Sequence, residues 1–533
     1  MSHNNSFRLA TFIIVTFAVV QFIIQVSLLL KGTEYVAVSL TIDDTYYYLQ
    51  TAWNAKVLGF VTFDGLHATN GVQLLWFVLI YLLALLAQTK TVLLFSTLAV
   101  SFLLNGLCYL IILKIGAIVR QPFLALIMAS LWALQSLPFR IYSMGMENSL
   151  HAFVFWCALW QSVEFLLRVQ RREKPNFLGL TIVLIINAWT RLDSALLSAI
   201  LFTFCVGMLA TTYRANLAVF VRTHGRAILG SSLLAGAGLV VQLTAFRLMG
   251  DSFLPVSALV KTSGAGRGVD VEPFEKLVRV FTLGMPSILQ GRFPDLLLMA
   301  IGVVGIVLVV LARVNARAAS DGMRAFLQLW SCLLAGETIY YVYIALSDAE
   351  YAPYFIWYRS PSFIFWIVTA SLLALSAFEY GSLAKRWTRV LHWAPLCSSL
   401  AIFALAVYMF VRSINFTSDL YVARYDVALW MAENSAADTV FASWNAGQLG
   451  YFSDRTVINL DGVINSVDYY ERVLVGSTSL SDYLIENNVD FVVDYDTYDS
   501  LPDFPVEHTF PLHDGSGRSI HIWRVVPHDS TAS

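Results

Sequence analysis

The chain has 533 residues, of which 58% are hydrophobic and 13% charged, and its formal net charge is −2. Soluble domains carry about 25% charged residues, so this composition excludes an ordinary water-soluble protein and indicates one embedded in lipid. The cysteines all lie inside apolar runs, which predicts a chain without a disulfide framework.

Apolar runs long enough to cross a bilayer, which takes about 20 residues per helix, recur from Phe12 to Phe410. The first run, residues 10–30, has no small-residue cleavage site before Lys31 and is predicted to remain as a membrane anchor. The runs that follow are 72–88, 91–113, 121–139, 150–167, 177–190, 194–211, 227–249, 295–312, 325–346, 362–380 and 393–412.

Loops rich in Lys and Arg favour the cytoplasm, because basic residues near the ends of membrane helices resist translocation. The basic loops of this chain predict a cytoplasmic N-terminus and an extracytoplasmic tail. Two outward loops, 31–71 and 142–149, are then separated by three apolar runs where parity requires an even number. We therefore expect 72–88 or 91–113 to be re-entrant or interfacial, with roughly 11 full spans in all. The basic loops are 168–174, 214–226, 313–324 and 385–389.

The composition changes abruptly near Asp419, where charged residues and Asn/Asp turns replace the apolar runs. Helical and strand patterns alternate along the tail, which predicts a small α/β layer domain. We therefore expect a polytopic α-helical membrane domain, 1–412, followed by an extracytoplasmic soluble α/β domain, 413–533. The predicted strands are TVFAS, VINL, DFVVDY and SIHIWRVV, and the predicted helices are DVALWMAENSA and residues 480–486.

An acidic pair, Asp43 and Asp44, lies in the outward loop that follows the first predicted span. Adjacent carboxylates repel each other unless a cation or a shared proton neutralises them, so the pair is a candidate for general base catalysis and metal ligation. Tyrosines follow directly at 46–48, and their rings suit both sugar faces and the bilayer interface. The alternative interpretation is a solvated loop or a helix cap.

A polar segment, TFDGLHATNGVQLLW, leads from this loop into the next apolar run. Its side chains Asp64, His67, Thr69 and Asn70 are candidates for orienting a donor phosphate or completing a cation site. The alternative is a structural turn followed by a helix cap.

Charged residues also stand at the outer ends of two later spans. Glu147, in YSMGMENSLHAF, begins an apolar helix, where a carboxylate is costly unless it is used. It is therefore a candidate site residue, with helix capping as the alternative. Arg191 and Asp193, at the break between two spans, either pair with each other or bind phosphate.

Two further outer loops carry cations. Lys261 and Arg267 lie among small residues in DSFLPVSALVKTSGAGRG, where they either hold a lipid phosphate or rest on lipid headgroups. Tyr358 and Arg359 belong to an aromatic loop that is either part of a binding site or an interface belt.

Taken in order, the motifs DDTYYYLQTAW, DGLHATNGVQLLW, GMENSL, WTRLD and LPVSALVK resemble the GT-C superfamily of membrane glycosyltransferases. Within that superfamily, the pattern is similar to bacterial relatives of the mycobacterial arabinofuranosyltransferases. The tail sequence WNAGQLGYFSDRTVINLDGVIN is also similar to the extracytoplasmic domains of such proteins. The resemblance spans most of the chain, and each motif in it is short.

The resemblance implies an inverting transfer of a hexosyl or pentosyl group from a polyprenyl-phosphate donor to a glycan, lipid or protein acceptor. It places this reaction at the outer face of a membrane, which we expect to be a bacterial inner membrane. Membrane lipids are expected partners, and nucleic acid is not.

The resemblance also implies roles for particular residues. Asp43 would be the general base or acceptor-orienting carboxylate, supported by Asp44. Glu147 would help hold the acceptor or a metal, with Asp44 as a second metal ligand, and Lys261 would meet the donor phosphate. A divalent cation, Mg²⁺ or Mn²⁺, stays an open expectation, because the second outer loop offers one carboxylate where some relatives have two.

A multi-helix transporter or flippase of a lipid-linked or small polar substrate is the main alternative. Transporters concentrate ionisable residues near the membrane midplane, on interrupted helices related by a repeat. The predicted carboxylates instead gather on one side of the membrane. An assembly or receptor protein is a second alternative, although an anchor requires far fewer helices.

Overall fold

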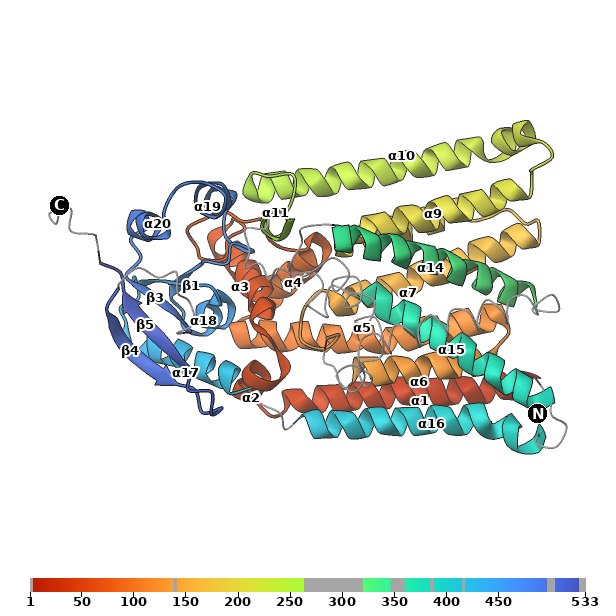
Figure 1. Ribbon diagram of the computed structural model, residues 1–533, viewed down its shortest axis with the longest axis horizontal. Coiled ribbons are helices and arrows are strands. Elements are labelled where there is room, and N and C mark those ends of the chain that lie inside the picture. Colours follow the sequence, from red (N-terminus) through yellow and green to blue (C-terminus); the bar gives the residue numbers. More distant parts are fainter. Residues whose placement is uncertain are drawn as a thin grey trace.

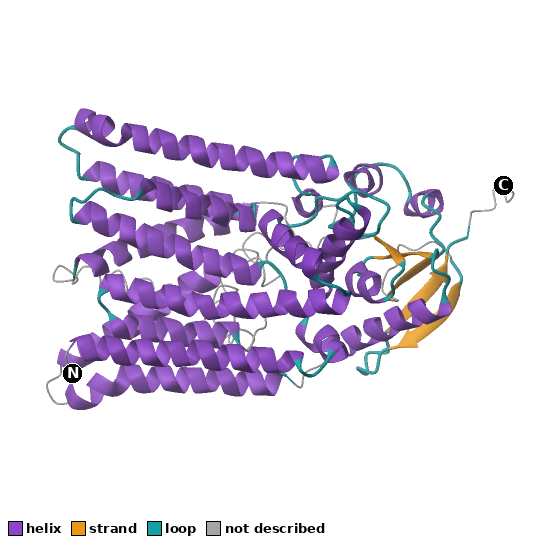
Figure 2. Cartoon of the chain, turned by 180° about the vertical axis from the view of Figure 1, so that it is seen from behind, coloured by secondary structure: helices purple, strands orange, loops and turns teal. Residues whose placement is uncertain are grey.

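Long helices run side by side along one axis of the molecule, and a small sheet domain sits at one end of their bundle (Figure 1). Seen from behind, the strands are confined to that end (Figure 2). The predicted fold class, a polytopic helical membrane protein with a C-terminal α/β domain, is confirmed. This computed structural model describes residues 3–137, 141–262, 320–346, 360–383, 388–414, 418–495 and 504–526.

Among these residues, six helices are long and apolar enough to cross a membrane. The total number of spans stays a prediction, because the run at 295–312 lies outside the described residues. The six helices are α1 (His3–Leu29), α5 (Lys90–Val119), α7 (Asn148–Gln170), α9 (Ser194–Thr211), α10 (Leu217–Gly250) and α16 (Thr388–Ser413). Further bundle helices are α6 (Pro122–Ser136), α8 (Phe177–Thr190), α14 (Asp321–Leu346) and α15 (Ser360–Leu383).

The parity argument left open which of the apolar runs 72–88 and 91–113 crosses the membrane. The two runs form helices of different lengths. The second forms α5, a helix of 30 residues that runs along the bundle (Figure 1). The first forms α4 (Leu74–Leu86), which has 13 residues and lies beside the sheet domain. At a rise of about 1.5 Å per residue, α4 is too short to cross a hydrocarbon core of about 30 Å.

Helix α3 (Asp43–Leu58) also lies between the bundle and the sheet domain (Figure 1). Its start is favoured by the two carboxylates in the first turn, because negative charge stabilises a helix N-terminus. The Thr45 hydroxyl accepts a hydrogen bond from the Ile42 N–H at 3.4 Å. The helix ends at Gly59, whose φ of 82° is a left-handed conformation that glycine adopts easily. The short helices α2 (Thr33–Tyr35) and α11 (Val256–Thr262) lie at the same end.

The C-terminal domain contains a five-stranded sheet of order β2-β1-β3-β5-β4. Strand β1 is parallel to β2 and β3, and β5 is antiparallel to β3 and β4. The parallel pairs are joined through helices, as such crossovers require. The elements are α17 (Asp419–Asn434), β1 (Val440–Ser443), α18 (Ala446–Phe452), β2 (Thr456–Asn459), α19 (Val467–Tyr469), α20 (Leu480–Glu486), β3 (Phe491–Tyr495), β4 (Val506–Pro511) and β5 (Ser519–Arg524).

The strands at 439–443, 457–460, 490–495 and 519–526 were predicted, whereas β4 and α18 were not. Strand β4 is exposed along nearly its whole length, so its sequence lacks the apolar alternation that reveals a half-buried strand. Helix α18 is buried over residues 446–451 and contains two glycines, which weaken a helical pattern.

The segment before α4 and the start of α5 are both in close contact with the C-terminal domain. The Thr69 hydroxyl donates to the Asn465 carbonyl at 2.8 Å, and Lys90 forms an ion pair with Asp454 at 2.7 Å. The two parts also approach closely at Gly71, where an added Cβ would lie 2.1 Å from the Val463 carbonyl oxygen. Only a residue without a side chain fits at this contact.

We predict that Gly71→Ala lowers the melting temperature of the detergent-purified protein, because its Cβ would overlap the backbone of the C-terminal domain. Overpacking of this kind costs about 1–3 kcal/mol. The matched control is Gly230→Ala in α10, where an added Cβ meets no atom within 4 Å among the described residues. Equal melting temperatures for the two variants would contradict the close contact.

Candidate active site

The two adjacent carboxylates at the start of α3 point in different directions. Successive residues of an α-helix are rotated by about 100°, and Asp43 and Asp44 accordingly serve different neighbours. Asp43 faces the C-terminal domain, whereas Asp44 lines a cleft at the end of the bundle. The acidic pair that the sequence treats as one feature is therefore divided between two environments.

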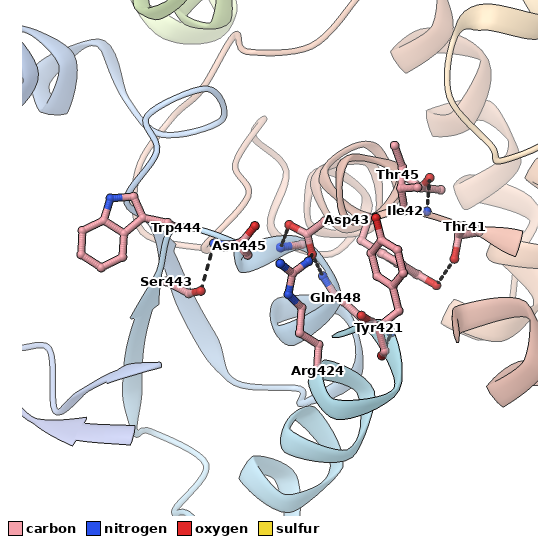
Figure 3. Close-up of polar contacts among 12 residues, drawn as sticks. Thr41, Ile42, Asp43, Thr45, Tyr421, Arg424, Ser443, Trp444, Asn445 and Gln448 are labelled. Carbon is pink, nitrogen blue, oxygen red and sulfur yellow. Dashed lines mark hydrogen bonds and ion pairs between the residues drawn. The ribbon is translucent and has the colours of Figure 1, made fainter. Parts of the chain in front are cut away.

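Asp43 is 7% exposed and is held by groups of the C-terminal domain (Figure 3). Its carboxylate oxygens accept hydrogen bonds from the Gly447 N–H at 3.1 Å and the Gln448 N–H at 2.9 Å. The Arg424 guanidinium lies 3.7 Å from the same carboxylate. These contacts compensate the negative charge of Asp43 on the side of α3 that faces the C-terminal domain, away from the cleft.

The cleft lies where α3, the start of α4, the turn before α7, α11 and the C-terminal domain meet. Three residues that the sequence proposed as site candidates, Asp44, Glu147 and Lys261, line it together. The described lining residues are Asp44, Tyr47, Tyr48, Gly71, Val72, Gln73, Met146, Glu147, Ser257, Lys261, Val463 and Ile464.

Asp44 is a lining carboxylate whose protonation is altered by its surroundings. Burial raises the pKa of Asp44 to about 6, Lys261 opposes this rise, and the negative charges of Asp43 and Glu147 add to it. A carboxylate with a pKa just below neutrality is ionised at pH 7 and can still take up a proton. These are the properties of a general base.

Glu147 stands before the first turn of α7 and is 2% exposed. One of its oxygens accepts a hydrogen bond from the Tyr48 hydroxyl at 2.9 Å, and the other pairs with Arg191 at 2.7 Å. Arg191 also binds Asp193 through two nitrogens, at 3.1 and 3.0 Å. Arg191 and Asp193 pair with each other, which is one of the two interpretations that the sequence left open, and the pairing extends to Glu147 in the cleft wall.

The polar segment before α4 is held by hydrogen bonds within itself and by a contact with the C-terminal domain. The Asp64 carboxylate accepts hydrogen bonds from the Leu66 and His67 N–H groups, each at 2.8 Å, and contacts His67 Nδ1 at 2.8 Å. This contact raises the pKa of His67. The other ring nitrogen, Nε2, lies 2.9 Å from the Asn487 side-chain oxygen of the C-terminal domain.

Asn70 connects the same segment to α11. Its side-chain nitrogen donates to the Ser252 carbonyl at 2.9 Å, and its side-chain oxygen accepts from the Val256 N–H at 2.8 Å. Since α11 carries Lys261, Asn70 and Thr69 fix two walls of the cleft relative to each other. Among the described lining residues, Asp64, His67, Thr69 and Asn70 do not occur. Arg267, Tyr358 and Arg359 lie outside the described residues.

The sequence did not single out the turn after β2, which reaches the cleft from the C-terminal domain. The Tyr47 hydroxyl donates to the Asp461 carboxylate at 3.3 Å, and the Val463 N–H donates to that carboxylate at 2.8 Å. Burial raises the pKa of Asp461 to about 7. The available signal was the polar run NLDGVIN directly after a predicted strand.

The expected divalent cation stays a prediction, with Asp44 and Glu147 as its predicted ligands. Both oxygens of Glu147 are engaged by Tyr48 and Arg191, and within the described ranges no group of three or more His, Cys, Asp or Glu residues is placed to hold a metal. Mg²⁺ is usually bound through one or two carboxylates together with substrate phosphates and waters.

We predict that Arg191→Met lowers the melting temperature strongly, because it leaves Glu147 buried without its counterion. Removing one partner of a buried ion pair costs about 3–5 kcal/mol. Adding Glu147→Gln to this variant should restore part of the loss. The control is Arg168→Met, which breaks the half-exposed pair with Glu164 and should cost at most about 1 kcal/mol. A similar loss in both single variants would contradict a stabilising role for the buried pair.

Comparison with known proteins supports this architecture. A family model described as "Domain of unknown function (DUF8728)" matches residues 413–529. No curated protein matches the chain. The structure of ArnT from Cupriavidus metallidurans bound to undecaprenyl phosphate is similar, with 13% identity, a TM-score of 0.52, and coverage of 96% of this chain and 97% of that one.

The apo structure of the same ArnT is similar at 12% identity, with a TM-score of 0.55 and coverage of 96% of this chain and 98% of that one. Both matches extend over almost the whole of either chain, membrane and C-terminal parts together. At these identities they establish the fold. The chain therefore shares the fold of these ArnT structures.

Proposed function

We propose that the protein is a membrane glycosyltransferase, which transfers a sugar from a polyprenyl-phosphate donor to an acceptor hydroxyl in the cleft. The observation that carries this proposal is the meeting of Asp44 and Lys261 in one cleft at the end of the bundle. Such a transfer requires a base for the acceptor hydroxyl and positive charge for the leaving phosphate. Undecaprenyl phosphate is bound in the similar ArnT structure, which supports this class of donor.

In the proposed reaction, Asp44 accepts the proton of the acceptor hydroxyl while that oxygen attacks C1 of the donor sugar. The bond between C1 and the phosphate oxygen breaks, and polyprenyl phosphate leaves with the bonding electrons. Lys261 and the Ser257 hydroxyl, both on α11, stabilise the charge of this phosphate. A single displacement of this kind inverts the configuration at C1.

Glu147 serves in this proposal as part of the cleft wall. Its pairing with Arg191 and Tyr48 holds the turn before α7 against α3. Tyr47 and Tyr48 offer ring surface for the sugar. In the proposed transfer, Asp44 and Lys261 supply the base and the positive charge, and the expected divalent cation stays a prediction.

We further propose that the cleft faces the extracytoplasmic side of a bacterial inner membrane. The connection between α9 and α10 lies at the opposite end of the bundle from the sheet domain (Figure 1). This connection carries Arg214, and Arg222 and Arg226 follow in the first three turns of α10, which begins within the predicted basic loop 214–226. Basic residues at the ends of membrane helices favour the cytoplasm. The donor's prenyl chain then stays in the outer leaflet, and a glycan, lipid or protein acceptor approaches past the C-terminal domain.

A transporter is less well supported. The ionisable groups of the cleft gather at one end of the bundle, on α3, α11 and the turn before α7. Transporters instead place such groups near the membrane midplane. An enzyme that works on a lipid-linked donor requires its reactive groups at the membrane surface, where the sugar is.

We predict that Asp44→Asn reduces sugar transfer by at least about 100-fold while the protein still inserts and folds, because the amide cannot accept the hydroxyl proton. Purified protein is incubated with a panel of labelled polyprenyl-phosphate sugars and acceptors, and released polyprenyl phosphate is measured. The control is Asp251→Asn, an exposed carboxylate at the end of α10. Transfer by Asp44→Asn at the rate of the control would refute the assignment of the base.

The pH dependence of transfer provides a second prediction. A base with a pKa of about 6 must lose its proton to act, so kcat/KM should rise from about pH 5 to about pH 7 and then level off. Lys261→Met removes the cation that lowers the pKa of Asp44, so the midpoint of its remaining activity should move to higher pH. A rate that falls with rising pH in this range would be inconsistent with a carboxylate base.

A further inference from the structure

Asp43 is bound by three groups that all belong to the C-terminal domain. Arg424 is on α17, and Gly447 and Gln448 begin α18. Two backbone N–H groups on one carboxylate fix its orientation as well as its distance, because each bond has a preferred direction. We refer to this arrangement of Asp43, Arg424, Gly447 and Gln448 as the Asp43 clasp (Figure 3).

The backbones also meet at the clasp. A Cβ added to Gly447 would lie 2.2 Å from the Asp43 carbonyl oxygen and 3.0 Å from its carboxyl carbon. The start of α3 therefore rests directly on the start of α18. Very little displacement of one against the other is possible while the clasp is closed.

The clasp is itself supported from both sides. The Gln448 side chain donates to the Tyr421 carbonyl of α17 at 3.2 Å and lies 3.5 Å from the Ala37 carbonyl, before α3. Arg424 is 5% exposed, and its guanidinium carbon lies 4.9 Å from the ring centre of Tyr495 on β3. The clasp thus ties α3 to α17, α18 and the sheet.

Asp44 is the next residue of the same helical turn, and Tyr47 and Tyr48 lie one turn further along α3. All three line the cleft, so a rotation of α3 displaces them together. We propose that Asp43 is a positioning residue, which the C-terminal domain clasps to hold α3 in the orientation that directs Asp44 into the cleft. The C-terminal domain is then an integral part of the active site. The inference rests on the proposed role of Asp44.

The competing interpretation makes Asp43 itself the base, as the sequence suggested. Both of its carboxylate oxygens accept hydrogen bonds from the C-terminal domain, and the described lining of the cleft does not include it. The two interpretations predict different orders of activity among variants. They also predict different effects of replacing Arg424. The clasp requires its guanidinium beside Asp43, whereas a catalytic base at Asp43 does not.

The test compares Asp43→Asn, Asp43→Ala and Arg424→Met with Asp44→Asn. An Asn at position 43 still accepts one backbone hydrogen bond, so it should retain more activity than Ala, and both should exceed Asp44→Asn. Arg424→Met keeps both carboxylates and should lower kcat by about 10- to 100-fold, the scale of a misplaced catalytic group. The donor KM should change little in each variant. Asp43→Asn as inactive as Asp44→Asn, with Arg424→Met fully active, would overturn the proposal.

Hydrogen exchange measured by mass spectrometry gives a readout that does not depend on activity. Backbone amides of α3 should exchange faster in Asp43→Asn and Arg424→Met than in the wild type. They should be unchanged in Asp44→Asn. The matched control is Asp454→Asn, which breaks the exposed ion pair with Lys90 at the same domain contact and should affect neither α3 nor kcat. Unchanged exchange of α3 in both clasp variants would also overturn the proposal.

These measurements distinguish a failure of the proposed function from a failure of the clasp. A wild-type protein that transfers sugar from no donor in the panel would count against the proposed function, while hydrogen exchange still decides whether Asp43 holds α3. Active wild-type protein with unaltered α3 exchange in the variants would instead refute the clasp alone.

Discussion

The contact of the C-terminal domain with the segment between α1 and α4 is the constraint on which the rest of the site depends. Asp43 binds Gly447 and Gln448, and Gly71 lies against the turn at 463–464. These contacts bring residues more than 390 positions apart into one wall. Without them, α3 would lose α18 as a neighbour, and the cleft would lose the wall formed by Val463 and Ile464.

Two of the buried carboxylates in this region each lie beside an arginine. Burying a carboxylate is costly unless it is paired or hydrogen-bonded. Asp43 lies beside Arg424, and Glu147 lies beside Arg191. Asp44 differs, because the cation that most lowers its pKa, Lys261, itself lines the cleft. That difference in surroundings distinguishes Asp44, which we propose as the base, from Asp43 and Glu147, whose arginine partners hold them in place.

The sequence predicted the fold class well, because long apolar runs and the abrupt change near Asp419 have direct physical meaning. It brought Asp44, Glu147 and Lys261 forward as candidates, and these residues do meet. It did not separate Asp43 from Asp44, since that division depends on where α3 begins and on partners in the tail. The bracing contacts of Asn70 were equally inaccessible, because its bonding partners lie on a distant loop.

The order of synthesis decides when Asp43 can bind α18. The ribosome releases the N-terminal helices first, and residues 446–452 emerge only after the whole bundle has been made. The partners of Asp43 on α18 therefore become available only after the membrane helices that precede them have been made. In the proposed arrangement, a chain truncated before α18 lacks the N–H groups that hold Asp43, so Asp44 is not yet directed into the cleft.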